Sequence, residues 1–409
     1  MIDKKKDKIK NKIKNRYELV IKKLQAGETN KKTKQNIQNK TMKKSFSPYI
    51  NRKLDINSLK TLKHEKINLC NSLIKINLGS VEKPRCLSYN NIEVIKFLLK
   101  NLKSTKHLDP SKFIAPKQLY SNCWFNTMFV SFFFSDKGRK FFRFFRNLMI
   151  TGRKYDGSRL KDQHLRVLLF VFNLYIEASY NQNSNKTLKN RNKNKTLKNR
   201  NNLHDQVKNL TANLETNFLI KKIYNRIKEI NPKYNLPNIN EAGNPLEYYK
   251  VIMIYLNYNV LNIKNIDVLK NSKKIYKNTD TIFKNTLLKN KKRCDIFIFE
   301  DHESKMDYME EYEVELNNKI YKYVLDSIIL TNKDHYNPKA NSHFVSVLTI
   351  NKEGYKFDGS SYSKLSKFNW KKILNKNIDF TFKENPNYYP EKYNFKYGYK
   401  ILFYYRKSI

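Results

Sequence analysis

Cysteine is scarce in this sequence, with four residues in a chain of 409. The cysteines form no Cys-x-x-Cys pair, so a zinc finger or ribbon is not expected, and no metal or other cofactor is predicted. Their low number and wide spacing also argue against a small secreted disulfide scaffold. We interpret Cys70 and Cys86 as ordinary small apolar residues, which leaves Cys123 and Cys294 to consider.

A long uninterrupted apolar segment is also missing. The N-terminus is basic but no apolar core follows it, so a secretory signal is not predicted. The most apolar stretch, Leu119 to Phe134, contains Ser, Asn and Thr and is followed by Lys137 and Arg139. This pattern indicates a buried helix and not a membrane span. A reducing intracellular location is therefore expected, in cytoplasm or nucleus, or in a virion if the source is viral.

Acidic residues are few, 36 against 82 Lys and Arg, and the net charge is +46. Such a charge is typical of proteins that bind nucleic acid or anionic surfaces. The basic residues are mostly Lys, however, and they are spread along the chain among many Asn, Ile and Tyr. We therefore favour the amino-acid usage of an AT-rich genome as their origin. Non-specific nucleic-acid contact stays open for the Lys-rich segment Met1–Lys44.

Changes in composition divide the chain into three parts. Residues 1–44 are predicted to be a basic, disordered tail, 45–109 an N-terminal extension, and 110–409 the main domain. A low-complexity insertion at 181–203 interrupts that domain, and in it the segment Asn185–Asn192 is repeated word for word at Asn194–Asn201. With so few apolar residues the repeat cannot build a core, so we interpret it as a solvated loop.

Helical patterns precede strand patterns, which predicts an α+β fold with an antiparallel β half and a cleft between the halves. Two helices are expected between Cys123 and Ile150. Another is expected at the sequence Asn244-Pro245, where Asn suits the N-cap and Pro the first turn, and a Lys/Asn-rich linker then leads to Arg293. Further helices are predicted at 164–180 and 206–230, and strands at 295–299, 323–330, 343–350, 355–357 and 399–405.

Cys123 stands where a polar segment meets the apolar helix pattern. The N-terminus of a helix presents unpaired N–H groups and a positive dipole end, which favour a thiolate there. A nucleophilic thiolate needs a base, and His343, in a predicted strand, is the first candidate. His335, in a polar loop, is the alternative.

Three short segments in the right order resemble ubiquitin-specific proteases, a papain-like family. Gln118-x4-Cys123-Trp124 resembles the Cys box of papain-like proteases, and Cys123-Trp124-Phe125-Asn126 is similar to the Cys-Tyr-Met-Asn of ubiquitin-specific proteases. Gly243–Leu256 looks like the helix near that family's Asp-Ala-x-Glu-Phe element, with Glu247 in the matching place. Asp326–Asp358 resembles its His box.

The resemblance implies a papain-like fold and a cysteine peptidase or isopeptidase that removes ubiquitin or a ubiquitin-like protein. Cys123 would be the nucleophile, His343 the general base and acid, and Asp358 the residue that orients the imidazole. Gln118 would donate to the oxyanion. Trp124, Glu247 and Ser342 would contact the substrate, although Ser342 stands where the family has glycine.

The predicted hairpin does not by itself bring the histidine and the aspartate together. A turn centred on Lys352-Glu353 pairs Asp358 with Val347 and not with His343. Four residues of strand span about 13 Å. A bulge or a slide into the loop is therefore expected. Asp326 and Asp334 are alternative partners for the histidine.

Other interpretations of the same residues stay open. Cys123 and His343 are each compatible with a structural role, as a buried thiol and a sheet histidine. A viral-type peptidase that processes the source's own polyproteins would use the same chemistry, and a non-catalytic, basic nucleic-acid-binding scaffold would use none of it. The acidic stretch Glu300–Glu315 is either a patch for a basic substrate or a solvated loop and edge strand.

Overall fold

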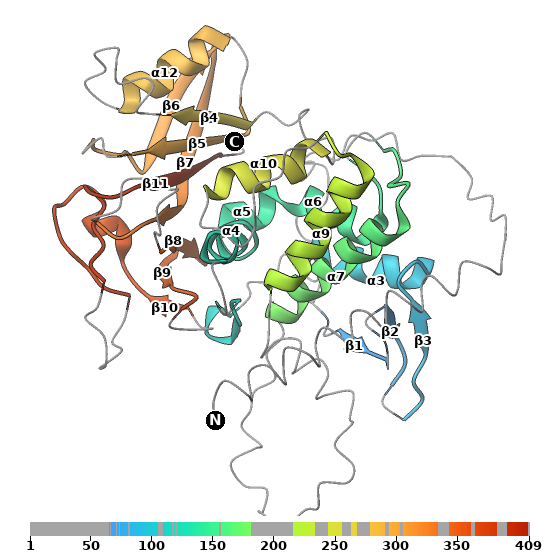
Figure 1. Ribbon diagram of the computed structural model, residues 1–409. Helices are drawn as coiled ribbons and strands as arrows, with labels where there is room; N and C mark the ends of the chain where they lie inside the picture. The colour runs from blue at the N-terminus through green and yellow to red at the C-terminus, as the bar shows by residue number, and fades with distance from the viewer. Residues whose placement is uncertain are drawn as a thin grey trace, which may run out of the picture.

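Helices fill one half of the molecule and a large β-sheet the other (Figure 1). The computed structural model describes residues 65–407 outside a set of gaps. The gaps are 66, 71, 73, 81, 105–108, 117, 119–121, 155–156, 181–215, 234–243, 256–262, 268–278, 291–293, 303–305, 334–342, 361–364 and 383–390. The predicted tail, the part of the extension before residue 65 and the repeat insertion lie outside the described residues.

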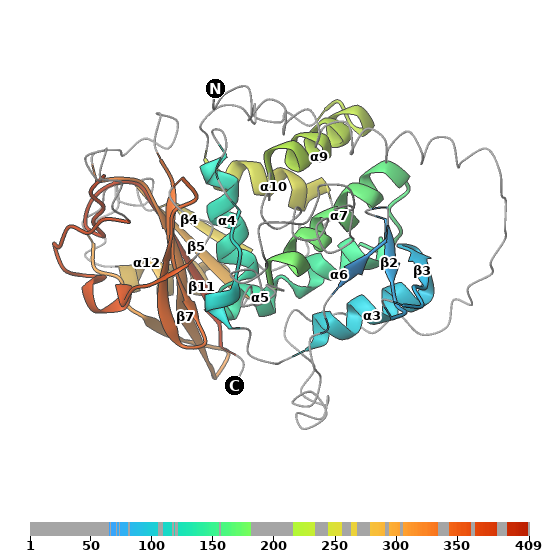
Figure 2. The same ribbon diagram turned by 90° about the horizontal axis from the view of Figure 1, so that it is seen from below.

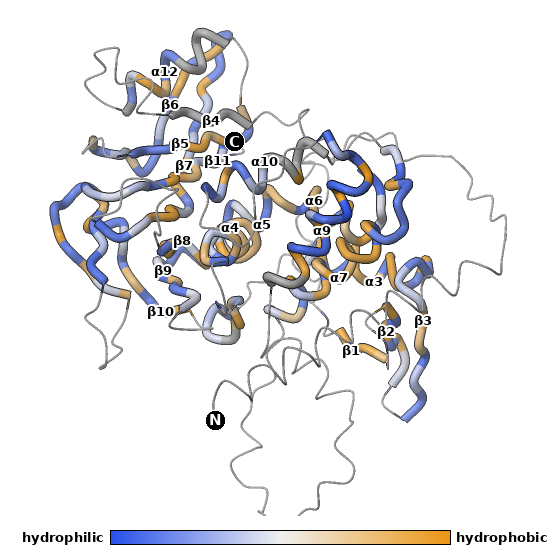
Figure 3. The backbone as a smooth tube through the Cα atoms, in the orientation of Figure 1, coloured by the Kyte–Doolittle hydropathy of each residue, from blue (hydrophilic) through white to orange (hydrophobic). Residues whose placement is uncertain are grey.

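The helical half is built around α4, which begins at Cys123 as predicted. Every residue of α4 is buried, because the helix lies between the sheet and the other helices (Figure 2) and has no solvent face. Figure 3 shows that α4 and α7 are coloured largely as hydrophobic, as expected for helices in the interior. The helices are α3 (Ile92–Lys103), α4 (Cys123–Phe133), α5 (Asp136–Phe141), α6 (Arg143–Thr151), α7 (Gln163–Tyr180), α9 (Thr216–Ile230), α10 (Pro245–Tyr255) and α12 (Thr279–Asn290).

Helix boundaries follow local capping chemistry. Asn244 accepts a hydrogen bond from the N–H of Leu246 at 2.9 Å, which confirms its predicted place before α10. Ser135 starts α5 by accepting from the N–H of Gly138 at 3.2 Å. The expectation of two helices between Cys123 and Ile150 is wrong, because the chain after this start is divided again at Phe142, which ends α5 and precedes α6. α5 and α6 then follow as two short helices.

The large sheet has the strand order β10-β9-β8-β7-β11-β5-β4, with β6 also pairing with β7. Neighbouring strands are antiparallel except β4 and β5, which are parallel. β11 follows all other described strands in the chain, yet it lies in the middle, between β7 and β5. The strands are β4 (Ile263–Asp267), β5 (Ile296–Asp301), β6 (Glu311–Leu316), β7 (Lys319–Leu330), β8 (Val345–Ile350), β9 (Glu353–Phe357), β10 (Ser366–Lys367) and β11 (Lys400–Arg406).

Helices and strands together confirm the α+β class, and five of the predicted strands appear with ends shifted by a few residues. The predicted linker between α10 and Arg293 is wrong in part, since it contains β4 and α12. Both elements are rich in Lys and Asn, so apolar spacing gave little signal there.

Both faces of the sheet are covered. In β11, Ile401 and Phe403 belong to the core shared with the helical half, whereas Leu402 and Tyr404 belong to a second core with Phe283 of α12. Successive side chains of a strand point to opposite faces, so each core receives alternate residues. Burial on both faces explains why β11 is almost wholly apolar in sequence.

The β8–β9 hairpin is tighter than the sequence suggested. Its turn is Asn351-Lys352, and both residues have positive φ, 51° and 67°, as a two-residue type I′ turn requires. Ser346 therefore pairs with Phe357, so Asp358 comes opposite the start of β8. The expected register, with Asp358 beside Val347, is wrong by two residues, and no bulge is needed.

Asp136, the first residue of α5, holds this turn against the helical half. Its Oδ1 accepts from the N–H of Asn351 and its Oδ2 from the N–H of Lys352, both at 3.0 Å. One carboxylate thus joins the helix after α4 to the hairpin that carries His343 and Asp358 at its open end.

We expect Asp136→Ala to lower the free energy of unfolding by about 1–3 kcal/mol, because two turn N–H groups lose their acceptor. Urea denaturation measures the loss. Asp280→Ala is the matched control: its partner is Lys284 at 2.7 Å on the exposed face of α12, and such pairs contribute about 0.3–0.5 kcal/mol. Equal losses in the two variants would contradict the role given to Asp136.

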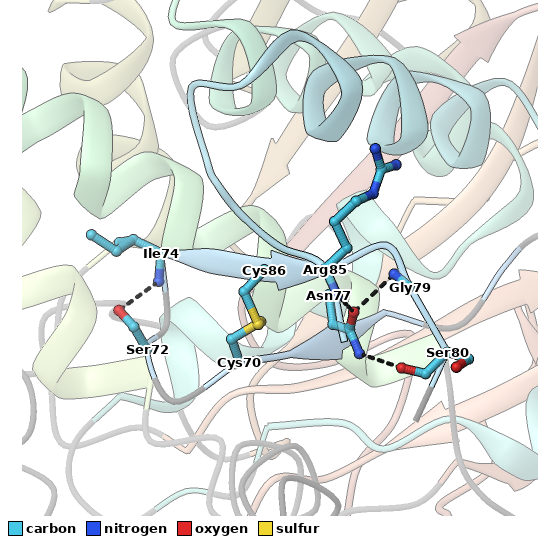
Figure 4. Close-up of a disulfide and its surroundings, with 8 residues drawn as sticks. All are labelled: Cys70, Ser72, Ile74, Asn77, Gly79, Ser80, Arg85 and Cys86. Atoms are coloured by element: carbon cyan, nitrogen blue, oxygen red, sulfur yellow. Dashed lines mark hydrogen bonds between the residues drawn. A yellow bond between two sulfur atoms is a disulfide. The ribbon is translucent and has the colours of Figure 1, made fainter. Parts of the chain in front are cut away.

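A second, three-stranded sheet precedes the helices and consists of β1 (Asn68–Leu69), β2 (Lys75–Asn77) and β3 (Cys86–Ser88). Cys70 and Cys86 form a disulfide beside it (Figure 4), so their interpretation as ordinary apolar residues is wrong. Asn77 holds the loop between β2 and β3 by accepting from the N–H groups of Gly79 and Arg85, each at 2.8 Å. Nothing in the spacing of the cysteines indicated this pairing.

In the part of the chain that the structure describes, no helix is long and apolar enough to cross a membrane.

Candidate active site

Cys123 is the first residue of α4 and is 5% exposed. Because α4 begins there, the sulfur lies at the end of the helix where backbone N–H groups converge. The preceding residue, Asn122, is the N-cap, but its side chain makes no capping bond to α4. It points elsewhere, to the first residue of α9.

His343 and Asp358 lie at the open end of the β8–β9 hairpin, two residues before β8 and one residue after β9. His343 Nε2 and Asp358 Oδ1 are 2.7 Å apart. The same carboxylate oxygen accepts from the N–H and the hydroxyl of Ser360, at 2.9 and 2.8 Å. The bonds from Ser360 hold the Asp358 carboxylate in one orientation, so the carboxylate can orient the imidazole of His343.

The imidazole of His343 is hydrogen-bonded to Cys123 as well as to Asp358. Since Asp358 occupies Nε2, the ring presents Nδ1 to the sulfur. Burial by itself lowers the pKa of His343, but the bonds and charges of Asp358 and Cys123 outweigh it and raise this pKa to about 10. The site therefore favours the imidazolium form.

Asp358 is the matching anion. Burial raises the pKa of its carboxyl, but the bond to His343 and those from Ser360 act in the opposite direction and bring the pKa to about 2. A neutral imidazole between a carboxylate and a thiol can accept the thiol proton, and the imidazolium that forms can deliver that proton elsewhere.

Gln118 lies near this group through its main chain. Its N–H donates to the carbonyl of Gly359 at 2.8 Å, which pins the segment before α4 to the loop that carries Asp358. Its side-chain Oε1 is buried and has no hydrogen-bond partner among the described residues. Gly359 is closely surrounded: a Cβ there would lie 3.4 Å from the carbonyl of Pro116 and 3.5 Å from Nδ2 of Asn126.

The remaining sequence-predicted residues are placed differently. Trp124 is fully buried and stacks on Tyr248 of α10 with ring centroids 3.9 Å apart. Glu247 is exposed on α10. Ser342, His335 and Asp334 lie outside the described residues, and Asp326 accepts from the N–H groups of Lys137 and Gly138 at the start of α5.

Four buried residues near the site were not anticipated. Asn122, Asn126 and Thr216 form a polar cluster beside Cys123. Burial, then the charge of Glu391 and those of Asp358 and Cys123, raise the pKa of Tyr393 well above its ordinary value, so this phenol stays neutral. The two asparagines are close to the cysteine in sequence, so their place near the site could have been predicted. Nothing in the sequence around Thr216 or Tyr393 indicated that they lie there.

The acidic stretch is largely paired with lysines. Glu313 of β6 pairs with Lys322 of β7 across the strands, and Lys407 lies 3.4 Å from Glu311. These contacts fit the interpretation as an edge strand. Within the described ranges no group of three His, Cys, Asp or Glu side chains is placed to hold a metal ion.

No family model matches the sequence, and no curated protein matches it. Among solved structures, the chain is similar to a chain of the SAGA Ubp8/Sgf11/Sus1/Sgf73 DUB module bound to ubiquitin aldehyde. The identity is 10%, the TM-score 0.40, and 82% of this chain and 81% of that chain are covered. Another structure of the SAGA Ubp8/Sgf11/Sus1/Sgf73 DUB module gives 11% identity and a TM-score of 0.33, covering 82% of this chain and 80% of the other. Similarity at this level carries no argument about function.

The fold and the site together define an α+β protein in which a partly buried histidine is hydrogen-bonded both to a buried cysteine and to a buried aspartate.

Proposed function

We propose that the protein is a thiol-dependent peptidase whose reacting groups are Cys123, His343 and Asp358. The observation that carries the proposal is one imidazole bonded by a thiol on one side and by a carboxylate, 2.7 Å away, on the other. The residues come from the start of α4 and from the open end of one hairpin, just before β8 and just after β9.

The reaction would proceed in two halves. The Cys123 thiolate attacks the carbonyl carbon of the scissile bond, and its proton is held on His343. The imidazolium then protonates the leaving amine, which departs and leaves a thioester on the sulfur. In the second half His343 takes a proton from water, the hydroxide attacks the thioester, and the thiol is released. Asp358 holds the ring in one orientation and stabilises its charged form throughout.

Gln118 is the proposed donor to the oxyanion of the tetrahedral intermediate. The main-chain N–H of Gln118 is hydrogen-bonded to Gly359, next to Asp358. The segment that carries this side chain therefore lies against the loop of the reacting groups. A donor of this kind typically contributes about 3–4 kcal/mol to lowering the barrier.

For the substrate we propose ubiquitin or a ubiquitin-like protein, cleaved after its C-terminal glycine. The support is the order of motifs in the sequence: the Cys box, the Glu247-Tyr248 helix and the His box. The papain-like description of the fold belongs to the same proposal.

A ubiquitin probe with a C-terminal electrophile tests this substrate. We expect one covalent adduct, mapped to Cys123 by mass spectrometry and lost in Cys123→Ala. Cys294→Ala is the matched control and should still react, because Cys294 is the other cysteine outside the disulfide and precedes β5.

Two other results would change the proposal. Cysteine-dependent cleavage of peptides without any adduct to ubiquitin would indicate a processing peptidase. Absence of both would contradict thiol catalysis and favour the nucleic-acid-binding scaffold. For that scaffold the alternating Phe and Arg residues at 141–146 offer no base-stacking surface, because all four phenylalanine rings are buried in the core.

A further inference from the structure

Thr216, the first residue of α9, contacts the helix that carries the nucleophile although 93 residues separate it from Cys123 in sequence. Its hydroxyl accepts from Nδ2 of Asn122 at 3.1 Å and donates to Oδ1 of Asn126 at 2.6 Å. The three side chains are 1% exposed or less. Donors and acceptors follow one direction along this chain of bonds, so each fixes the next.

The two asparagines lie on either side of Cys123. Asn122 precedes it, and Asn126 is one helical turn further along α4. Asparagine at an N-cap normally turns its side chain onto the first N–H groups of the helix. Here the Asn122 side chain is bonded to the hydroxyl of Thr216 instead. It therefore makes no capping bond to the first N–H groups of α4, at the end where Cys123 lies.

The other end of the chain of bonds faces the aspartate loop. Because Thr216 binds Oδ1 of Asn126, the Nδ2 of the same amide is turned towards Gly359, where a Cβ would lie 3.5 Å away. This Nδ2 is buried and has no hydrogen-bond partner among the described residues. Gly359 follows Asp358 directly, so the amide faces the loop that carries the partner of His343.

We propose that Thr216 is a positioning residue of the reaction centre, which keeps the Asn122 side chain off the start of α4 and holds Asn126 against the Asp358–Gly359 loop. The inference rests on the proposed function. It assigns a part in the chemistry to α9, an element that contributes no reacting group. A hydroxyl that only filled space in the core would contribute to stability and leave the sulfur unaffected.

The consequence of losing the hydroxyl follows from the N-cap. In Thr216→Val the amide of Asn122 has no partner on α9, and it can turn back to cap α4. The N–H groups at the start of the helix then donate to the amide oxygen, and the helix N-terminus stabilises the negative charge on the sulfur less strongly. The thiolate becomes less favoured, and the imidazolium of His343 with it.

The test is the pH dependence of Cys123 alkylation by iodoacetamide, followed on the Cys123 peptide by mass spectrometry in the full-length protein. We expect the profile of Thr216→Val to move to higher pH and the rate at pH 6 to fall about tenfold, a change that corresponds to about 1.4 kcal/mol. Thr216→Ser, which keeps the hydroxyl, should stay within about threefold of the unmodified protein.

Thr151→Val is the matched control. The Thr151 hydroxyl donates to the carbonyl of Asn147 at 2.8 Å in α6 and accepts from the N–H of Arg153 at 3.2 Å, so its loss also removes two hydrogen bonds, here at the end of a helix. We expect a lower melting temperature in that variant with no change in the alkylation profile. If Thr216→Val does not fold, Thr216→Ala removes the same hydroxyl without the extra methyl and is measured in its place.

An unchanged alkylation profile in a folded Thr216 variant overturns the proposal, whatever happens to the melting temperature. So does a Thr216→Ser profile that moves as far as that of Thr216→Val. The measurement needs no substrate, so it decides this inference even if the ubiquitin probe fails to react. Where the protein does turn over a ubiquitin substrate, kcat should fall with KM within about twofold, since no binding contact is removed.

Discussion

Cys123→Ser is expected to lower kcat/KM by about 10⁴–10⁶-fold, the largest effect of any single substitution proposed for this protein. The hydroxyl of serine is a far weaker acid than a thiol. The imidazole, already bonded to Asp358, therefore receives no proton from it at neutral pH. The measurement is the rate of hydrolysis of a fluorogenic ubiquitin C-terminal substrate at substrate concentrations above and below KM.

The serine variant also serves as its own folding control. Serine is close to cysteine in volume, and Cys123 lies at the edge of the core at the start of α4, so the melting temperature should change little. Residual activity above one-hundredth of the starting value in a folded Cys123→Ser protein would mean that another group attacks the carbonyl. The reaction scheme proposed for α4 would then be wrong.

Asp358→Asn is expected to reduce kcat by about 10²–10⁴-fold, because an amide cannot hold the imidazolium as a carboxylate does. The pH profile should change as well. The bond to Asp358 raises the pKa of His343, so removing the charge lowers this pKa, and the alkaline limb of kcat/KM moves to lower pH. Rates measured from pH 5 to pH 10 give both quantities.

Asp379→Asn is the matched control for this substitution. Its carboxylate also has a lowered pKa, caused first by Lys333 and then by Asn394, but it lies on the surface of the β half. The pH profile of the control should coincide with that of the unmodified protein. An alkaline limb that stays in place in Asp358→Asn would contradict the assignment of Asp358 as the partner of His343.

The same pair makes stability depend on pH in a defined window. The pKa of His343 is raised in the folded state, so its contribution is complete below the unfolded value near 6.5 and is lost as pH rises through about 10. The pKa of Asp358 is lowered, so its contribution is complete above about 4 and is lost as pH falls through about 2. Both contributions are present together between about pH 4 and 6.5.

Local patterns predicted the elements that carry the site. The boundary between polar and apolar residues at Cys123 indicated the start of α4, and the sequence Asn244-Pro245 indicated the start of α10. Both signals depend on a few adjacent residues and on capping chemistry that acts within one turn. Tertiary contacts did not override them.

Features that depend on distant contacts were predicted poorly. The hairpin turn contains a lysine with positive φ, which Asp136 supports from another element, and the expected turn at Lys352-Glu353 therefore gave the wrong register. The pairing of Cys70 with Cys86 requires the fold of β2 and β3 to bring the sulfurs together. Thr216 follows a long low-complexity segment, and nothing in its neighbourhood points to Cys123.

The central position of β11 sets the order in which a working molecule can arise during synthesis. The ribosome delivers the thiol helix early, whereas β11 joins β5 to β7 only after nearly all of the described chain has emerged. Until then the nascent polypeptide has no continuous sheet to support the imidazole. Under the proposed function, an unfinished chain would therefore carry Cys123 without the complete sheet on which the reaction centre rests.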